Sequence, residues 1–562
     1  MTIDKTHLPI PSLRFINEED ESLLVVKHPN ECDIAVVGSG TSALTAALVA
    51  SIHGAEVVVL EKSEQFGGSS ALSGGQLWIP NNSYERAAGI VDTRESAFKY
   101  LKRLSVGRVE PGLIDAFLDN SPKALEFLVQ STPLQPRLRA DEPDYHPEWP
   151  GASRGGRTLD PGLFDGRLLG SKYRNLRHNP QYHLRGGVHT TSLEFERLMR
   201  GEDLSELKKR KPSTVALGEA LVGSLRKGLL DRKVPVFLSC RATRLLQADA
   251  RIVGVEVSMN GRREEIQTRR AVVLAAGGFE WNQVMKRQYL ASPSENSAGC
   301  PTNTGDGIRM GMNVGAAVSL MEEAWWFTLI LKPGEKRGWL TTSERTLPGS
   351  IMVNRAGKRF ANEAMNYNDL GRVMLRLDSR TYERTNIPAY LVFDANHRGH
   401  YSLIDVGPGA SPPRWVARGK TLAELAKRLG IDAVSLDQTV KKFNRGASEG
   451  RDPEFHRGES LYDRHWGDPS STNPTLGALT KPPFYGVRVL AGDIGTKGGL
   501  RTNGKGQALN SDGEVIEGLY AAGNNMASVM GPGYAGSGAT LGPCLTFGFI
   551  AGMNAISKAS NE

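Results

Sequence analysis

The feature that most constrains this chain is the glycine-rich turn GSGTSA at residues 38–43. It follows the apolar run CDIAVVG, which has the composition of a buried strand. It also opens the small-residue run TSALTAALVASIHG, which has the composition of a helix ended by Gly54. A second apolar run, AEVVVLE, ends at Glu61, 21 residues after Gly40. This order of strand, turn, helix and strand predicts an α/β fold that binds a dinucleotide.

Each position of the turn has a physical reason in such a site. Gly38 makes the tight turn, and Gly40 lets the backbone approach a pyrophosphate. The helix begins with Thr41 and Ser42, and its N-terminus favours the negative charge. Ala43 allows close packing of the helix on the strand, and Glu61 can accept a hydrogen bond from a ribose hydroxyl.

The segments that follow favour FAD over NAD. The run EKSEQFGGSSALSGG (61–75) offers a second cluster of glycine and serine directly after the ribose acid, suited to an extended dinucleotide. The runs AVVLAAGGF and GLYAAGN each end a strand in small residues, where a second crossing of the chain can approach the cofactor. The predicted cofactor-binding set therefore adds Lys62, Gly68, Ser69, Ser70, Ser73, Gly74, Gly75, Ala242, Ala276, Gly277, Gly523 and Asn524.

Both ends of the chain carry this nucleotide-binding pattern. RIVGVEVSMNGRREEIQTRRAVVLAAGGF (251–279) alternates with period two around an Asn260-Gly261 turn, which predicts a hairpin leading into another strand. EVIEGLYAAGN (514–524) predicts a further buried strand. Residues 338–490 differ in composition from these nucleotide-binding segments. The prediction is a Rossmann-like FAD-binding domain of residues 1–337 and 491–562, with an inserted α+β catalytic (capping) domain of residues 338–490.

Over nearly its whole length the layout resembles the fumarate reductase and 3-ketosteroid dehydrogenase flavoprotein superfamily. In some members a histidine near the SSALSGG position holds the flavin covalently. This chain has no histidine between His53 and His146, so the resemblance implies non-covalent FAD.

Members that reduce fumarate bind two carboxylates, which calls for histidine and arginine. At the corresponding positions this chain has Gly495, in GDIGTKGG, and Tyr534, in GPGYAGSGA. The missing pair argues against an enoate reductase of the fumarate type, which remains an alternative.

Five segments resemble the 3-ketosteroid Δ1-dehydrogenases: SGGQLWIPNN, PDYHPE, NEAMNYND, RGESLYDRHWGDP and GYAGSGATLGP. The resemblance implies catalytic roles for Tyr145, Tyr367, Tyr534 and Gly538. Tyr534 and the Gly538 N–H would form an oxyanion hole for the ketone, where a side chain at 538 would crowd a flat sterol ring. Tyr367, assisted by Tyr145, would remove a proton alpha to the ketone, and a hydride would pass to flavin N5.

The same resemblance places a helix N-terminus at the flavin. The helix that starts near Thr540 and Leu541 would point at the pyrimidine ring and stabilise its reduced anion. Gly538, Thr540 and Leu541 complete the predicted cofactor-binding set. The implied function is the introduction of the carbon 1–2 double bond into a 3-ketosteroid, in steroid degradation, with a quinone-like or other electron acceptor.

Two further alternatives stay open. A 3-keto-5α-steroid Δ4-dehydrogenase shares the tyrosines and acts on the other side of the ketone. A flavin-carrying electron-transfer subunit without catalysis of its own would leave Tyr145, Tyr367 and Tyr534 far apart.

Composition narrows the partners and the compartment. The net charge is +8, and the one dense basic run is LKKRK (207–211), a solvated segment or a patch for peripheral membrane association. No basic stripe interleaved with aromatics indicates nucleic acid, and no apolar run reaches the ~20 residues of a membrane span. The N-terminus lacks the pattern of a secretory signal, and the four scattered cysteines predict reduced thiols without a metal, so we expect a cytoplasmic location.

Three further side chains have two interpretations each. Trp325 and Trp326 in EEAWWF could line a sterol cleft, but the composition favours core packing. Glu363 in NEA is expected to fix a loop and not to transfer protons.

Overall fold

The computed structural model describes residues 29–184, 188–199 and 202–556. Its first sheet has eight strands, with a parallel core of β10 (Val236–Phe237), β2 (Val57–Leu60), β1 (Glu31–Val37), β13 (Arg262–Leu274) and β23 (Val515–Ala521). β2 and the last four residues of β1 are fully buried, as expected of continuous apolar runs covered on both faces. β22 (Gln507–Leu509) extends the sheet beside β23.

The predicted hairpin is present, with one difference. β11 (Cys240–Ala248), β12 (Arg251–Met259) and β13 pair antiparallel, and Asn260 and Gly261 make the turn with φ of 51° and 76°. Two positive φ values in a two-residue loop suit the twist of the flanking strands. The hairpin strand and the core strand are a single element, because β13 is 13 residues long and pairs first with β12 and then with β1 in the parallel sheet.

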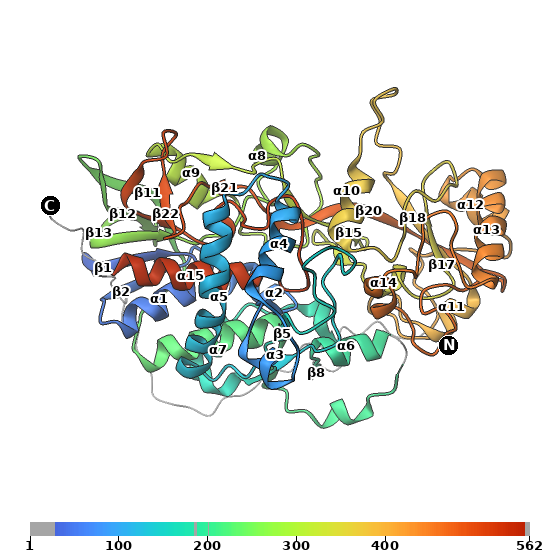
Figure 1. Cartoon of the computed structure of the whole chain (residues 1–562), viewed down its shortest axis with the longest axis horizontal. Helices are drawn as coiled ribbons and strands as arrows, with labels where there is room; N and C mark the ends of the chain where they lie inside the picture. Colours follow the sequence, from blue (N-terminus) through green and yellow to red (C-terminus); the bar gives the residue numbers. More distant parts are fainter. Residues whose placement is uncertain (1–28, 185–187, 200–201, 557–562) are drawn as a thin grey trace.

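Two helices from opposite ends of the chain pack together on this sheet (Figure 1). They are α1 (Thr41–Ile52) and α15 (Leu541–Ala555). A Cβ added at Gly548 would lie 2.5 Å from the backbone oxygen of Ser42, and one at Gly552 would lie 2.7 Å from that of Ala46. The small residues of both helices therefore permit a close backbone approach.

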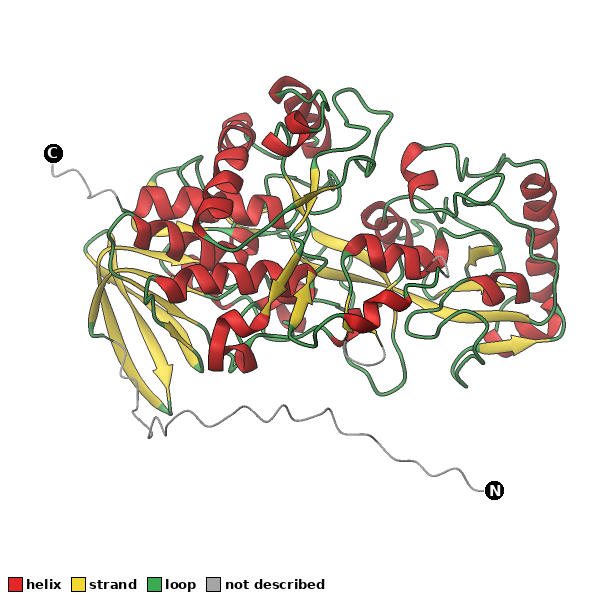
Figure 2. Cartoon of the chain, turned by 90° about the horizontal axis from the view of Figure 1, so that it is seen from below, coloured by secondary structure: helices red, strands yellow, loops and turns green. Residues whose placement is uncertain are grey.

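A second, antiparallel sheet forms the other lobe (Figure 2). It contains β16 (Trp339–Leu340), β15 (Ala324–Ile330), β20 (Phe484–Thr496), β18 (Ala389–Phe393), β17 (Ser350–Val353) and β19 (Ala417–Gly419). α12 (Leu422–Leu429) and α13 (Ala433–Ser448) pack on one another beside it. The mixed α/β fold confirms the predicted fold class, while the boundaries at 338 and 490 stay a prediction.

Other predictions concern single segments. Residues Leu217–Asp231 form α7. All four cysteines are buried, and none of them forms a disulfide. The basic run lies partly in a short 3₁₀ helix, Ser205–Lys209, with Lys208 and Lys209 exposed. Among the described residues, none of the helices combines the length and apolar character that a bilayer crossing requires. The predicted absence of a secretory signal concerns residues 1–28, which lie outside the described part.

Candidate active site

The glycine turn between β1 and α1 has the geometry that its sequence predicts. Gly38 has a φ of 108°, and a Cβ there would lie 2.4 Å from the carbonyl oxygen of Ala275 on the neighbouring chain crossing. Gly40 is the N-cap of α1 and supplies no side-chain cap. The Thr41 N–H donates to Ser70 Oγ at 3.0 Å, and the next N–H groups of the first helical turn remain available to a ligand.

Glu61 is buried beside this turn. One carboxylate oxygen accepts a hydrogen bond from Ser39 Oγ at 2.5 Å, and the other accepts from the Ser63 N–H at 2.8 Å. Burial raises its pKa, although these hydrogen bonds oppose the rise. Nearby, Lys62 Nζ pairs with Asp306 at 2.9 Å.

One cavity runs from the glycine turn to the tyrosines. Its lining contains 19 of the predicted cofactor-binding residues: Gly38, Gly40, Thr41, Ser42, Glu61, Lys62, Gly68, Ser69, Ser70, Ser73, Gly74, Gly75, Ala242, Ala276, Gly277, Asn524, Gly538, Thr540 and Leu541. The other two, Ala43 and Gly523, lie behind the lining. Ala43 is fully buried in α1, and a Cβ at Gly523 would lie 2.1 Å from Ser42 Oγ.

A second helix N-terminus opens onto the same cavity. α15 begins at Leu541, and its N-cap Thr540 makes no side-chain cap hydrogen bond. Thr540, Leu541 and Cys544 all line the cavity. Two helix N-termini, a buried carboxylate and a glycine turn without room for a Cβ fit a dinucleotide whose phosphates are anionic and whose ring system becomes anionic on reduction.

The structure brings the three predicted tyrosines together from three separate segments. The ring centroids are 5.1 Å apart for Tyr145 and Tyr534, 5.3 Å for Tyr145 and Tyr367, and 5.2 Å for Tyr367 and Tyr534. All three are buried, and all three line the cavity. This arrangement is the opposite of what the electron-transfer alternative predicts.

Hydrogen bonds and ring contacts fix the tyrosines. The Tyr534 hydroxyl lies 2.9 Å from Thr540 Oγ1, and the Tyr145 hydroxyl lies 3.4 Å from Ser537 Oγ. Tyr367 is the first residue of α10 (Tyr367–Leu375), and its ring stacks on Phe327 with centroids 4.0 Å apart. Burial raises the pKa of each of the three hydroxyls, so the cluster is neutral near pH 7.

A neighbouring backbone segment, in addition to the predicted substrate ring, explains why residue 538 is glycine. Its φ is 88°, and a Cβ would lie 2.6 Å from the backbone carbonyl of Gln76. The approach of that backbone, and not only a substrate ring, requires glycine here. Within the described part of the chain, the Gly538 N–H has no hydrogen-bond acceptor.

The cavity also has lining residues that the sequence did not reveal. They come from α6 (Ser192–Met199), from around β16 and from the loop after α14 (Leu461–His465). They include Phe195, Glu196, Arg337, Leu340, Thr342 and Trp466. Apart from Trp466, which lies in the segment RGESLYDRHWGDP, no local motif marks these positions, because segments distant in the chain meet only in the folded molecule.

Trp325 and Trp326 are buried in β15, and neither is among the residues that line the cavity. The core-packing interpretation therefore fits Trp326. Trp325 packs edge-on against Tyr534, with ring centroids 4.9 Å apart. It supports the site from behind.

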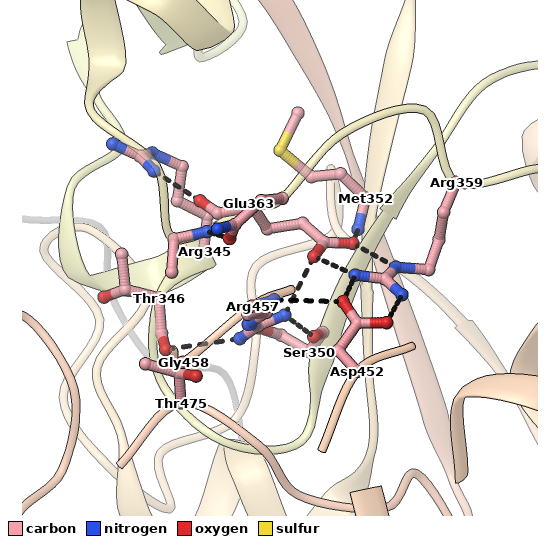
Figure 3. A network of polar contacts seen from close by, with 12 residues as sticks. Arg345, Thr346, Ser350, Met352, Arg359, Glu363, Asp452, Arg457, Gly458 and Thr475 are labelled. Carbon is pink, nitrogen blue, oxygen red and sulfur yellow. Dashed lines mark hydrogen bonds and ion pairs between the residues drawn. The ribbon is translucent and has the colours of Figure 1, made fainter. Parts of the chain in front are cut away.

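Glu363 fixes a loop, as predicted (Figure 3). Its carboxylate accepts two hydrogen bonds of 2.7 Å from Arg359 and one of 3.1 Å from the Met352 N–H. Arg457 contacts the same carboxylate at 3.2 Å. Burial alone would raise the pKa of Glu363, but the two guanidinium groups hold it below its usual value. Arg345 donates to the Glu363 carbonyl as well, just before Tyr367 in the chain.

The FAD binding domain family matches residues 33–541. The 3-oxosteroid 1-dehydrogenase of Mycobacterium tuberculosis (strain ATCC 25618 / H37Rv) is 41% identical over 95% of this chain and 99% of its own length. This chain belongs to the FAD-binding family that includes the 3-oxosteroid 1-dehydrogenases. It is accordingly an FAD-dependent oxidoreductase.

Two further members of this family are informative. The 3-ketosteroid delta1-dehydrogenase from Sterolibacterium denitrificans, solved in complex with 1,4-androstadiene-3,17-dione, is 40% identical with a TM-score of 0.90. The match covers 94% of this chain and all of that one. The 4-oxocyclohexanecarboxylate 2-dehydrogenase of Sinomonas cyclohexanicum is 39% identical over 94% of this chain and 93% of its own length.

Proposed function

We propose that this protein is an FAD-dependent 3-ketosteroid Δ1-dehydrogenase, which introduces the carbon 1–2 double bond into a 3-ketosteroid. One observation carries the proposal: Tyr145, Tyr367 and Tyr534 meet in the wall of the cavity that also holds the dinucleotide residues. The similarity to 3-oxosteroid 1-dehydrogenases over nearly the whole chain supports the same reaction.

The ketone oxygen binds between Tyr534 and Gly538. The Tyr534 hydroxyl donates one hydrogen bond, and the unpartnered Gly538 N–H donates the second. Both donors are fixed before substrate arrives, since Tyr534 is wedged against Trp325 and Gly538 against the Gln76 backbone. Such donors stabilise the negative charge that develops on the oxygen when the alpha carbon loses its proton.

Tyr367 takes that alpha proton, and Tyr145 assists it. Because burial raises the pKa of Tyr367 well above 10, its tyrosinate form is scarce at neutral pH. The acidifying effect of the bound ketone makes the transfer feasible, and the Tyr145 ring lies against Tyr367, with centroids 5.3 Å apart. Bound FAD supplies the acceptor for the hydride that leaves the neighbouring carbon.

A dicarboxylate reductase is disfavoured by the space at Gly495. Its φ is 151°, and a Cβ there would lie 2.7 Å from Asn524 Nδ2 and 3.3 Å from the Trp325 ring. A histidine could not stand at this position without moving both. The Δ4-dehydrogenase alternative shares the tyrosines. Analysis of the product distinguishes it from the Δ1 reaction, because the two reactions place the new double bond on opposite sides of the ketone.

A second candidate substrate is a monocyclic 4-oxo acid. The Sinomonas relative carries this substrate class in its name, and Arg337 lines the cavity of the present chain. Arg337 already donates to the Ala298 carbonyl at 2.8 Å and to Asn179 Oδ1 at 2.9 Å. These contacts favour a structural role for Arg337 and so favour the steroid.

Anaerobic incubation with each ketone separates these candidates. The purified flavoprotein is mixed with 4-androstene-3,17-dione, with a saturated 3-keto-5α-steroid or with 4-oxocyclohexanecarboxylate, and the product is identified by mass spectrometry and NMR. Fast flavin reduction by the first compound with a 1,4-diene product supports the proposal. Faster reduction by the monocyclic acid would replace it.

Other aspects of the function are also proposals. The electrons leave to a quinone-like or other acceptor, because the chain carries one dinucleotide fingerprint and no second one for NAD. Exposed Lys208 and Lys209 would support peripheral association with an anionic membrane surface. A cytoplasmic location stays a prediction.

A further inference from the structure

We infer that Lys497 is a positioning residue for this reaction, because its ammonium group ties the loop that bears Tyr534 to the helix that begins at Tyr367. The inference rests on the proposed function, since it concerns the same tyrosines. Lys497 follows β20 and lies outside the lining of the cavity.

The contacts of Lys497 Nζ are all with acceptors. It donates to the carbonyl oxygens of Pro532 at 2.6 Å and Gly533 at 2.8 Å, and to Asn368 Oδ1 at 3.2 Å. Pro532 and Gly533 directly precede Tyr534, and Asn368 directly follows Tyr367 in the sequence. An ammonium group has three N–H donors and no acceptor, so three acceptors use it completely. A neutral amine would leave one of these oxygens without a donor.

The positive charge is placed where it is costly. Lys497 is 1% exposed, and among the described residues no carboxylate lies within ion-pair distance of it. Lys286, which is equally buried, does have such a partner, Asp493, at 2.7 Å. Burial lowers the pKa of Lys497 to about 7, while the charges of Glu323 and Asp369 oppose this fall. The three acceptors bind the ammonium form. A lysine used only to fill space would not need this arrangement.

The hydrogen bonds of Lys497 Nζ to Pro532, Gly533 and Asn368 are called the clamp below. Ring contacts extend this clamp to Tyr534 itself. Lys497 Nζ lies 4.6 Å from the centre of the Trp325 ring, and that ring packs edge-on against Tyr534. The cation therefore holds the Tyr534 loop through its backbone and the Tyr534 ring through Trp325.

The base of the clamp is fixed as well. The Lys497 N–H donates to the Glu323 carbonyl, and its own carbonyl accepts from the Ser528 N–H, both at 3.0 Å. A Cβ at the next residue, Gly498, would lie 2.4 Å from Met321 Cα. The ammonium group therefore projects from a backbone that has little freedom to follow a displaced loop.

The test compares Lys497→Met with Lys497→Gln and with the control Arg372→Met. Methionine keeps the length of the side chain but makes no clamp, whereas glutamine retains two donors without the charge. Arg372 also contacts the Pro532 carbonyl, at 3.4 Å, but its side chain is 42% exposed and pairs with Glu323. FAD content and the thermal unfolding midpoint are measured for all three variants.

The decisive quantities are the limiting rate of anaerobic flavin reduction by the ketosteroid and the dissociation constant of that ketone. Loss of the clamp misplaces the tyrosines, so Lys497→Met should lower the rate about 10- to 100-fold. The dissociation constant should change much less, by about threefold. Glutamine should give an intermediate rate, and Arg372→Met should stay within about threefold of the wild type.

A wild-type rate in Lys497→Met with full FAD content would overturn the inference, as would equal losses in Arg372→Met. Should the methionine variant fail to hold FAD, Lys497→Gln decides in its place, and a wild-type rate there overturns the inference too. If wild-type flavin is not reduced by the ketosteroid, the proposed function fails. The clamp is then judged by a crystal structure of a Lys497 variant, in which residues 532–534 must have moved.

Discussion

Tyr534 lies in a run of small residues because its loop closely approaches neighbouring side chains and backbone, while the tyrosine itself lines the cavity. Gly533 and Gly536 would each place a Cβ within 2.8 Å of Leu104 and Trp78, respectively, and Gly538 meets the Gln76 backbone. A bare phosphate loop has no use for a phenol at its centre, whereas an oxyanion hole needs a fixed donor. Close packing therefore explains the glycines, and the need for a fixed hydrogen-bond donor explains the one tyrosine.

Tyr367 should control the pH dependence of the chemical step. A neutral phenol cannot accept a proton, and burial raises the pKa of Tyr367 well above its usual value. The reactive form is therefore scarce at low pH and increases with pH, so the rate of flavin reduction by a 3-ketosteroid should rise between about pH 6 and pH 9. Stopped-flow absorbance at saturating substrate measures it.

Tyr367→Phe removes the proton acceptor and keeps the ring that stacks on Phe327. The rate should fall by about 10²–10⁴, and the remaining rate should lose the rise with pH. Tyr382→Phe, at an exposed tyrosine, is the matched control. A Tyr367→Phe rate that keeps the wild-type magnitude and slope would assign the base to another group.

At the scale of elements, the close contact of α1 and α15 brings the cofactor turn and the substrate loop to one cavity. Gly548→Ala places a methyl group 2.5 Å from the Ser42 backbone oxygen, and Ser42 lines the cavity. The helices must separate, so we expect a loss of about 1–3 kcal/mol in the free energy of unfolding, together with weaker FAD retention. Urea unfolding and flavin release on gel filtration measure the two effects.

Gly112→Ala is the control for this change. It lies in the first turn of α5 (Pro111–Ser131), where a Cβ would meet nothing within 4 Å. Alanine should leave stability unchanged or raise it slightly, because glycine is a poor helix former. Equal destabilisation by both substitutions would contradict the account of the α1–α15 contact.

The Glu363 network should stabilise the loop that leads to Tyr367. Glu363→Gln leaves two buried guanidinium groups without part of their counter-charge, at an expected loss of about 3–5 kcal/mol in the free energy of unfolding. The folded-state pKa of Glu363 lies below its unfolded value of about 4.5. Its contribution is therefore complete above pH 4.5 and is lost as the pH falls through the folded-state pKa.

Urea unfolding at pH 7 and near pH 4 tests the network, with Glu459→Gln, at an exposed carboxylate, as the control. The difference between wild type and Glu363→Gln should shrink on acidification, while the control stays near the wild type at both values. A difference that is constant with pH would mean that packing, and not charge, carries the effect.

At the scale of the whole molecule, local patterns predicted much of the fold and of the cofactor site. The glycine turn, the acid at Glu61 and the Asn260-Gly261 hairpin all follow from short segments whose backbone conformation is set locally. The resemblance supplied the tyrosines, and the structure placed them together. The roles assigned to these residues stay predictions until they are tested by substitution.

What the sequence could not predict depends on contacts between distant segments. Arg337 and Trp466 line the cavity because loops from both lobes converge there. The role of Lys497 could not be predicted, because a lysine in TKGG carries no local sign of burial or of its three acceptors. The backbone neighbour of Gly538, Gln76, lies more than 460 residues away in the chain and could not be identified from the loop alone.

The measurement that tests the central claim most directly is anaerobic mixing of the wild-type protein and Tyr534→Phe with 4-androstene-3,17-dione, followed by flavin absorbance. The variant keeps the ring packed on Trp325 and loses only the hydroxyl that donates to the ketone. If the Tyr534 hydroxyl donates to the ketone, the wild type should bleach rapidly and the variant at a rate about 10²–10³ lower. Equal bleaching rates in both proteins, or no bleaching of the wild type, would contradict it.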